Sequence, residues 1–428
     1  MAMQRLRWAL TRINLLFHTP AGLSVGRLGS QSLSLFTAPI IAQAIGPTGR
    51  GLTAAALAAV TITGVIIGLG VPLAVRRRVV DETQRHDAVR SARILTWCTV
   101  PLGGLLALAP LFTVLTQLDH IAKIAFVIAM SLSGLTFSWS IDHNVMVAEK
   151  RYFRILWIGS IQTVAYFAVV LTLWILDALS VASVLFAYAA GTVAAFLLGR
   201  FWVRTPSGQS TQKLSLLREG ATLWGSQAGQ VASARLDQFL VLPLIGAGAT
   251  GLYSVAATIG SLPVTIGLAL GTSVFREFVL EQSKAKYTQA VRLAIAVALS
   301  LAIALALASI WGIPWLFGAE FKGSVPLAAI ALLGGVALSG NHVCTMALVA
   351  SERGKSMTAV QLAGLAVGIG ALYPATAIAG ATGAAVASTL GYLTTFAGAL
   401  LTLGIRPWDA VPRPRDFPQG FRAFLKRQ

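Results

Sequence analysis

The stretch "SARLDQFLVLPLIGAGATGLYSVAATIG" (residues 233–260) carries two charged residues near its start, Arg235 and Asp237, and none after them. About 20 apolar helical residues cross the hydrocarbon core of a bilayer, so a run of this length predicts a membrane-spanning segment. Inserting a charge at mid-membrane costs about 2.5–3.5 kcal/mol, so each of the two residues needs a partner or water. The stretch indicates a membrane protein whose interior is partly polar.

The composition of the whole chain agrees with this interpretation. Of 428 residues, 56% are hydrophobic and 11% are charged, whereas a soluble domain has about 25% charged residues. Long apolar runs recur from end to end, which predicts an all-α integral membrane protein. The net charge of +18 does not indicate a nucleic-acid partner, because basic residues of membrane proteins gather in cytoplasmic loops. Cys98 and Cys344 lie in apolar segments, so we expect no disulfide framework, metal site or cofactor.

Apolar runs between charged or turn-rich breaks predict twelve transmembrane helices. Of the 33 Lys and Arg residues, 29 lie in connections, termini or span ends on one side of this arrangement; Arg50, Lys123 and Lys322 lie on the other, and Arg235 lies well inside a span. By the positive-inside rule, both termini are cytoplasmic and the chain is multi-pass in the cell membrane. The predicted spans cover residues 24–45, 50–75, 94–115, 121–147, 153–176, 180–200, 219–244, 249–275, 290–316, 325–349, 357–378 and 382–405.

The second half of the chain resembles the first. "SQSLSLFTAPIIAQAIGPTGRGLTAAA" (30–56) is similar to "SQAGQVASARLDQFLVLPLIGAGATGLYSVAA" (226–257), with Gly51 matching Gly251 at an offset of 200. Six spans per half make the repeats parallel, related by an axis along the membrane normal. Transporters built from such repeats bind substrate between the halves, so we expect a central cleft there.

The sequence divides into two halves with three flanking or connecting segments. "MAMQRLRWALTRINLLFHTP" is basic and lacks a cleavage site, which predicts an uncleaved amphipathic helix on the membrane surface. A break containing Pro206, Ser207 and Gly208 separates the halves. The predicted parts are an amphipathic N-terminal segment (1–23), a first six-helix half (24–200), a cytoplasmic linker (201–217), a second six-helix half (218–405) and a cytoplasmic tail (406–428).

Polar residues recur at three- and four-residue spacing on the first and seventh spans, which places them on one helix face. A polar stripe faces the bundle interior or water, although small polar residues also serve close helix packing. Arg235 and Asp237 are two residues apart and do not face each other, so each needs its own partner; a buried lock between helices is the alternative for both. The candidate cleft residues are Arg27, Gln31, Ser34, Gln227, Gln230, Ser233, Arg235 and Asp237.

Two further polar stretches lie near the predicted cytoplasmic side. In "SWSIDHNVMVAEKR" (138–151), Asp142 and His143 are candidates for proton or ion coupling together with Asp237, with snorkelling to the surface as the alternative. The charge run "RRRVVDETQRHDAVRSAR" (76–93) predicts a solvated loop near anionic lipid headgroups.

The pattern resembles the polysaccharide (O-antigen, repeat-unit) flippases of the multidrug/oligosaccharidyl-lipid/polysaccharide (MOP) exporter superfamily. "ARLDQFLVLPLIGAGATGLYSVAATI" (234–259) resembles their seventh-to-eighth helix signature, and "APIIAQAIGPTGRG" (38–51) their first-to-second helix junction. The resemblance implies alternating-access transport of a polyprenyl-diphosphate-linked oligosaccharide to the outer leaflet, for cell-surface polysaccharide biosynthesis. Membrane lipids and polysaccharide assembly proteins are the implied partners. Family cavities are cationic, which Arg27 and Arg235 would satisfy.

Other functions remain open. A multidrug or cation antiporter of the same superfamily would need acidic cavity residues, for which Asp237 and Asp142 are the candidates. A peptidoglycan-precursor flippase would carry further helices, and a major-facilitator carrier would carry a different motif after its second span. A polysaccharide polymerase or ligase would need large outer loops. Outer loops such as "AIGPTGRG" (44–51) are short and collect no acid, base and nucleophile, so we do not expect an enzyme.

Overall fold

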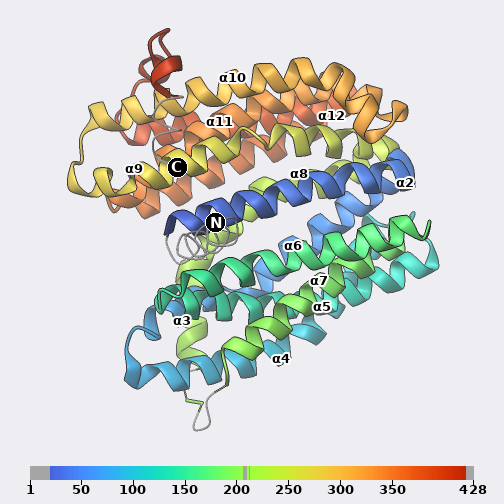
Figure 1. The fold of residues 1–428 in the computed structure, drawn as a ribbon, viewed down its shortest axis with the longest axis vertical. Helices are drawn as coiled ribbons and strands as arrows, with labels where there is room; N and C mark the ends of the chain where they lie inside the picture. The colour runs from blue at the N-terminus through green and yellow to red at the C-terminus, as the bar shows by residue number, and fades with distance from the viewer. Residues whose placement is uncertain (1–19, 206–209, 212, 421–428) are drawn as a thin grey trace, which may run out of the picture. The chain divides into compact units, whose positions relative to one another are not determined.

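The computed structural model describes residues 20–205, 210–211 and 213–420. Within these residues every regular element is helical, as the sequence predicts. The N-terminal amphipathic segment lies almost wholly outside the described residues, as do parts of the predicted linker and of the C-terminal tail. The elements (Figure 1) are α2 (Pro20–Gly68), α3 (Val71–Arg78), α4 (Glu82–Thr113), α5 (His120–Ala148), α6 (Tyr152–Ile175), α7 (Val181–Trp202), α8 (Lys213–Gly260), α9 (Val264–Leu280), α10 (Lys284–Phe317), η1 (Ala319–Gly323), α11 (Ser324–Ala350), α12 (Gly354–Thr402) and η2 (Pro407–Ala410).

Three helices are too long for one crossing of a bilayer. α2, α8 and α12 contain 49, 48 and 49 residues, which at 1.5 Å per residue would reach about 70 Å, against a hydrocarbon core of about 30 Å. Each is broken at a glycine with positive φ: Gly46 (64°), Gly246 (79°) and Gly380 (54°). Glycine adopts this left-handed conformation without steric cost. The described chain has nine helical segments apolar and long enough to span a membrane, and the three breaks fall between predicted neighbouring spans.

The two legs of α12 pack against each other on either side of the break at Gly380. A Cβ on Gly364 would collide with the Thr395 hydroxyl and approach the Gly391 carbonyl oxygen to 2.7 Å. Near the turn, a Cβ on Gly383 would collide with the Ala375 carbonyl oxygen. These approaches explain the glycines and show that α12 is a hairpin of two predicted spans.

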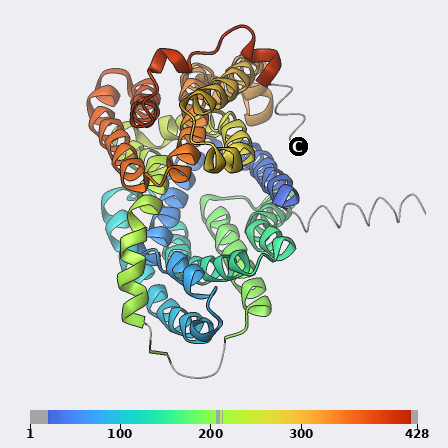
Figure 2. The same cartoon turned by 90° about the vertical axis from the view of Figure 1, so that its left-hand side faces the viewer.

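The chain forms two compact units: residues 1–44 with 56–228, and residues 45–55 with 229–428. In the first unit α5 packs against both α4 and α7, and α6 packs against α7; Figures 1 and 2 show these helices as lengthwise neighbours. In the second unit α11 packs against α9, α10 and α12. Buried apolar side chains pack in each unit, among them Ile141 and Val145 on α5 and Val343 and Ala347 on α11.

A reciprocal contact within the second unit joins the two repeated turns. A Cβ on Gly51 would collide with the Ala247 carbonyl oxygen, and a Cβ on Gly251 would collide with the Pro47 carbonyl oxygen. Both pairs are related by the offset of 200 residues that relates Gly46 to Gly246. An internal two-fold repeat produces this reciprocity, and only glycine permits the backbones to come so close.

The charge run at 76–93 is not the solvated loop that the sequence predicts. Only the junction between Arg78 and Glu82 lacks helix, and Asp81 caps α4 by accepting the Thr83 N–H at 2.9 Å. Hydrogen bonds from the Thr83 hydroxyl and N–H hold the pKa of Asp81 below its usual value. Arg93 is buried, with 5% exposure. The prediction was wrong because exposed charges on the outer face of α4 conceal a buried face at helical spacing.

The topology can be tested with reporter fusions at opposite ends of single helices. We expect a reporter fused after Lys123 or Lys322 to be outside, and one fused after Arg151 or Arg353 to be inside, because basic residues favour the cytoplasmic side. Activity of a reporter that works only outside the cytoplasm measures this directly. A reversal at any of the four positions would contradict the twelve-span topology.

Candidate functional site

Asp237 on α8 is held by hydrogen bonds within the second unit. The Tyr253 hydroxyl and the Ser388 hydroxyl both donate to Asp237 Oδ2, the latter at 3.1 Å. The Gln238 N–H donates to Asp237 Oδ1 at 2.7 Å, and the two hydroxyls lie 2.8 Å apart. Tyr253 is fully buried, with 1% exposure. Asp237 thus has the partners that its place on a spanning segment requires.

A second contact joins α8 to the second leg of α12, four residues from Asp237 on α8. Ser233 and Asp237 are four residues apart on α8, and Ser388 and Tyr392 are four apart on α12, so each pair shares a helix face. The Tyr392 hydroxyl donates to the Ser233 carbonyl oxygen at 3.3 Å. Part of the predicted polar stripe therefore packs against α12, and Asp237 links three segments of the second unit.

Arg235 is placed differently from Asp237. Its side chain is exposed, and no hydrogen bond or ion pair joins it to another residue in the described part of the chain. Residues two apart on a helix do not face each other, so Arg235 makes no hydrogen bond to Asp237, although its charge acts on Asp237 and Tyr392 across space. A guanidinium exposed on a spanning segment requires water or an anion, because hydrocarbon excludes it.

The remaining candidate cleft residues lie on α2 and α8. The backbone is helical at each of them, and their side chains lie outside what the structure describes. The central cleft between the halves therefore stays a prediction. These residues are Arg27, Gln31 and Ser34 on α2, and Gln227 and Gln230 on α8.

Replacing Tyr253 with phenylalanine tests the Asp237 network. We expect Tyr253→Phe to lower the free energy of unfolding by about 1–3 kcal/mol, because it removes a donor from a buried carboxyl group. The measurement is the unfolding midpoint of the detergent-solubilised protein. Tyr373→Phe on α12 is the matched control, since Tyr373 is 71% exposed. Equal midpoints for the two variants would show that the network contributes no stability.

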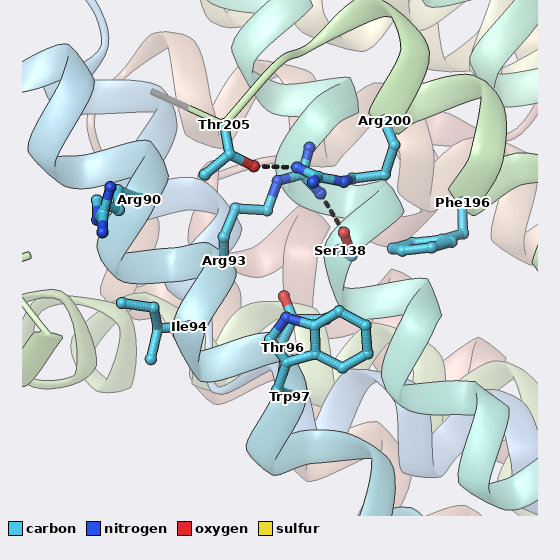
Figure 3. Close-up of a pocket in the computed structure, with 9 residues that line it drawn as sticks. All are labelled: Arg90, Arg93, Ile94, Thr96, Trp97, Ser138, Phe196, Arg200 and Thr205. Carbon is cyan, nitrogen blue, oxygen red and sulfur yellow. Dashed lines mark hydrogen bonds between the residues drawn. The ribbon is translucent and has the colours of Figure 1, made fainter. Parts of the chain in front are cut away.

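A second polar cluster lies in the first unit, where α4, α5 and α7 meet. Arg93 donates from Nη2 to Asp142 Oδ1 and, at 3.2 Å, to the Val203 carbonyl oxygen. Arg93 Nη1 donates to the Ser138 hydroxyl (Figure 3). The side chains of Arg93 and Asp142 are 6% and 0% exposed. Asp142 therefore does not snorkel to the surface, and a buried cation compensates its charge.

Small residues permit this cluster to close. A Cβ on Gly199 of α7 would collide with Asp142 Oδ2, so glycine lets α7 approach the carboxylate.

The His143 ring lies 5.9 Å from that of Trp139, one turn earlier on α5. The expected role of Asp142, His143 and Asp237 in ion coupling stays a prediction.

Sequence reasoning did not single out Arg93, Ser138 or Ser388. Arg93 stands at the end of a run of exposed charges, and serines on apolar helices are common packing residues. Tyr253 was present in the quoted motif, 16 residues after Asp237, but without an assigned contact. The one sequence signal for the burial of Arg93 was its position four residues after the apolar Val89, which places both residues on one helix face.

Solved structures with the same fold are membrane transporters. The lipid II flippase MurJ, in an inward closed conformation, matches with a TM-score of 0.71 at 13% identity, covering 95% of this chain and 91% of that chain. An inward-facing multidrug resistance MATE transporter of the MOP superfamily gives 0.64 at 12% identity, covering 94% and 98%. The MATE multidrug transporter DinF-BH gives 0.64 at 13% identity, covering 91% and 95%. These likenesses establish the MOP fold.

The family follows from the sequence. The sequence model of the polysaccharide biosynthesis protein family matches residues 21–275, more than half of the chain and both quoted motifs. The chain belongs to this family, as its resemblance implied, and it has the fold of the MOP-superfamily transporters. A search of the curated protein sequences finds no match.

Proposed function

We propose that this transporter is a flippase for a polyprenyl-diphosphate-linked oligosaccharide, which it moves from the inner to the outer leaflet of the cell membrane for cell-surface polysaccharide biosynthesis. A diphosphate-sugar headgroup is too polar to cross hydrocarbon unaided. Its passage needs a hydrophilic path with cationic and hydrogen-bonding walls, while the lipid tail stays in the bilayer. Membership of a polysaccharide biosynthesis family and a fold shared with a lipid flippase both support this assignment.

The exposed Arg235 carries the proposal. It is a permanently charged group on the seventh span, exposed and without an ion-pair partner among the described residues. A guanidinium forms bidentate charge-assisted hydrogen bonds with phosphate oxygens. We infer that Arg235, together with Arg27 on the first span, offers positive charge to the diphosphate. The polar residues of the two stripes would bind the sugars during alternating access.

The contacts of the acidic residues favour this function over drug or cation antiport. A cation antiporter needs a carboxylate free to take its substrate or a proton. Asp237 accepts hydrogen bonds from Tyr253 and Ser388, and Asp142 is paired with Arg93. Asp237 is thus engaged through both carboxylate oxygens, and Asp142 is engaged through Oδ1.

An outer-face polymerase or ligase is not supported either. The connections at the ends predicted to be outside are short: 114–119 joins α4 to α5, and 176–180 joins α6 to α7. Neither offers room for an active site of several loops.

Substitutions at Arg235 test the assignment in cells depleted of the native protein. We expect Arg235→Lys to retain part of the transport, because it keeps the charge but loses the planar fork. Arg235→Glu should reduce transport at least about tenfold, since a carboxylate repels the diphosphate. The readout is accumulation of lipid-linked oligosaccharide at equal protein abundance, with the exposed Lys355→Glu as control. Normal transport by Arg235→Glu would contradict the role of this arginine.

The same assay separates the two interpretations of Asp237. Asp237→Asn still accepts hydrogen bonds from Tyr253 and Ser388, so as a packing lock it should transport nearly normally. As a proton or cation site it should stall, because the amide cannot ionise.

A further inference from the structure

A cavity of about 250 Å³ lies beside the buried Arg93–Asp142 pair in the first unit (Figure 3). α4 and α7 form its walls, and Ser138 of α5 contributes to its floor. The side chains of Arg93 and Arg200 extend toward each other from opposite walls. Arg90 also lines the cavity, so three arginines from two helices contribute to one small space.

Arg93 and Arg200 place two positive charges beside the cavity, whereas Asp142 supplies one carboxylate and is paired with Arg93. Arg200 donates to the Thr205 hydroxyl, a neutral acceptor. The Arg93 Nε is buried and has no hydrogen-bond partner among the described residues. Two guanidinium groups directed at one space repel each other unless an anion lies between them.

On each wall of the cavity, an aromatic residue lies about one helical turn from an arginine. On α4, Trp97 follows Arg93 by four residues; on α7, Phe196 precedes Arg200 by four. Because α4 and α7 run in opposite directions in the predicted topology, the backbone of each aromatic residue would lie about 6 Å deeper in the membrane than that of its arginine. Trp97 is 67% exposed. Cationic groups at the surface with aromatic rings beneath them match the order of a phospholipid from phosphate to acyl chain.

A second cavity, of about 340 Å³, adjoins the first on the side of the basic connections. The two share Thr205, and the second is lined by Arg85, Arg151 and Arg204 among other polar residues. Glu149 accepts from Arg85 at 2.5 Å and from Arg151 at 2.6 Å. A polar headgroup that extends beyond the phosphate would enter this second, hydrophilic space.

We propose that the arginine cavity between α4 and α7 binds the phosphate of an anionic phospholipid from the leaflet predicted to be cytoplasmic. Arg93 and Arg200 hold the phosphate oxygens, Trp97 and Phe196 contact the first acyl carbons, and the headgroup points into the adjoining cavity. Basic pockets between transmembrane helices on the cytoplasmic side are a recurrent form of lipid recognition. The bound lipid links α4 directly to α7 and stabilises the first unit. This site holds a resident lipid, so it is independent of the proposed cargo.

Thermal unfolding of the delipidated full-length protein in neutral detergent tests this proposal. The probes are a short-chain phosphatidylglycerol, a phosphatidylcholine of the same chain length, and inorganic phosphate. A ligand that binds only the folded protein raises Tm with concentration. We expect phosphatidylglycerol to raise Tm with an apparent Kd at least about tenfold tighter than that of either other probe.

Matched variants locate the binding. The double variant Arg90→Gln/Arg200→Gln leaves the buried Arg93 intact and should weaken phosphatidylglycerol binding at least about tenfold. Arg218→Gln/Lys355→Gln removes the same net charge from exposed positions and should bind as the parent does. Trp97→Ala, which changes no charge, should also weaken binding by phosphatidylglycerol.

Three outcomes would overturn the proposal. Equal protection by phosphatidylcholine would show that the phosphate site does not select anionic lipid. Equal protection by inorganic phosphate would assign the cavity to a soluble phosphate instead of a lipid. Undiminished phosphatidylglycerol binding by the cavity variants, or an equal loss in the exposed control, would place the binding elsewhere. Transport is not part of the readout, so failure here leaves the proposed function standing.

Discussion

Asp142→Ala is expected to lower the free energy of unfolding by about 3–5 kcal/mol, because it leaves Arg93 buried without its counter-charge. The two side chains are 6% and 0% exposed, so Arg93 is largely shielded from bulk water after the carboxylate is lost. The measurement is chemical or thermal unfolding of the purified protein in detergent. Arg93→Met combined with Asp142→Leu should recover much of the loss, because it removes both charges and keeps the volume.

An exposed ion pair provides the control. Lys286 and Glu281 lie 2.5 Å apart, with side chains 41% and 61% exposed. Glu281→Ala should change the stability by at most about 1 kcal/mol. If Asp142→Ala costs no more than Glu281→Ala, the buried pair does not stabilise the first unit as the structure implies.

The second large effect concerns the repeated glycines. Gly51→Ala and Gly251→Ala each place a Cβ against a backbone carbonyl oxygen, of Ala247 or Pro47. Backbone atoms cannot rotate away as a flexible side chain can, so the two turns must separate. We expect each variant to lose about 1–3 kcal/mol of stability, the usual cost of overpacking, and to lose most of its transport.

Gly312→Ala is the control, because it should change the stability in the opposite direction or not at all. Gly312 lies within α10, and a Cβ there would meet no atom within 4 Å. Alanine in a helix interior is more stable than glycine by up to about 1 kcal/mol, so Gly312→Ala should be neutral or stabilising. Stabilisation by Gly251→Ala of the same size would contradict the close contact between the repeats.

Much of the fold could be predicted from the sequence, because a bilayer imposes strong constraints on length and charge. The apolar runs predicted the spans, and the three breaks in long helices fall at glycines between them. The offset of 200 residues relates Gly46 to Gly246 and Gly51 to Gly251, and the structure brings the second pair into contact. Where charges lined one face of a helix, as at 82–93, the prediction of a loop failed.

The contacts of the site residues could not be predicted, because they depend on how helices meet. Asp237 and Tyr253 are 16 residues apart, about 24 Å along a straight helix. The break at Gly246 brings the hydroxyl to the carboxyl group. Likewise, Arg93 and Asp142 are on different helices, and no sequence period relates them. The sequence shows the charges and the spacing of polar residues. Candidate site residues could therefore be named from it, but their contact partners could not.

Translocation by the purified protein in liposomes tests the central claim most directly. A fluorescent polyprenyl-diphosphate-linked oligosaccharide is placed in one leaflet, and its appearance in the other is followed by an impermeant quencher. We predict protein-dependent translocation of this lipid, lost with Arg235→Glu, and no transport of a cationic dye. Transport of the cationic dye without movement of the lipid-linked oligosaccharide would contradict the account and identify the protein as a drug exporter.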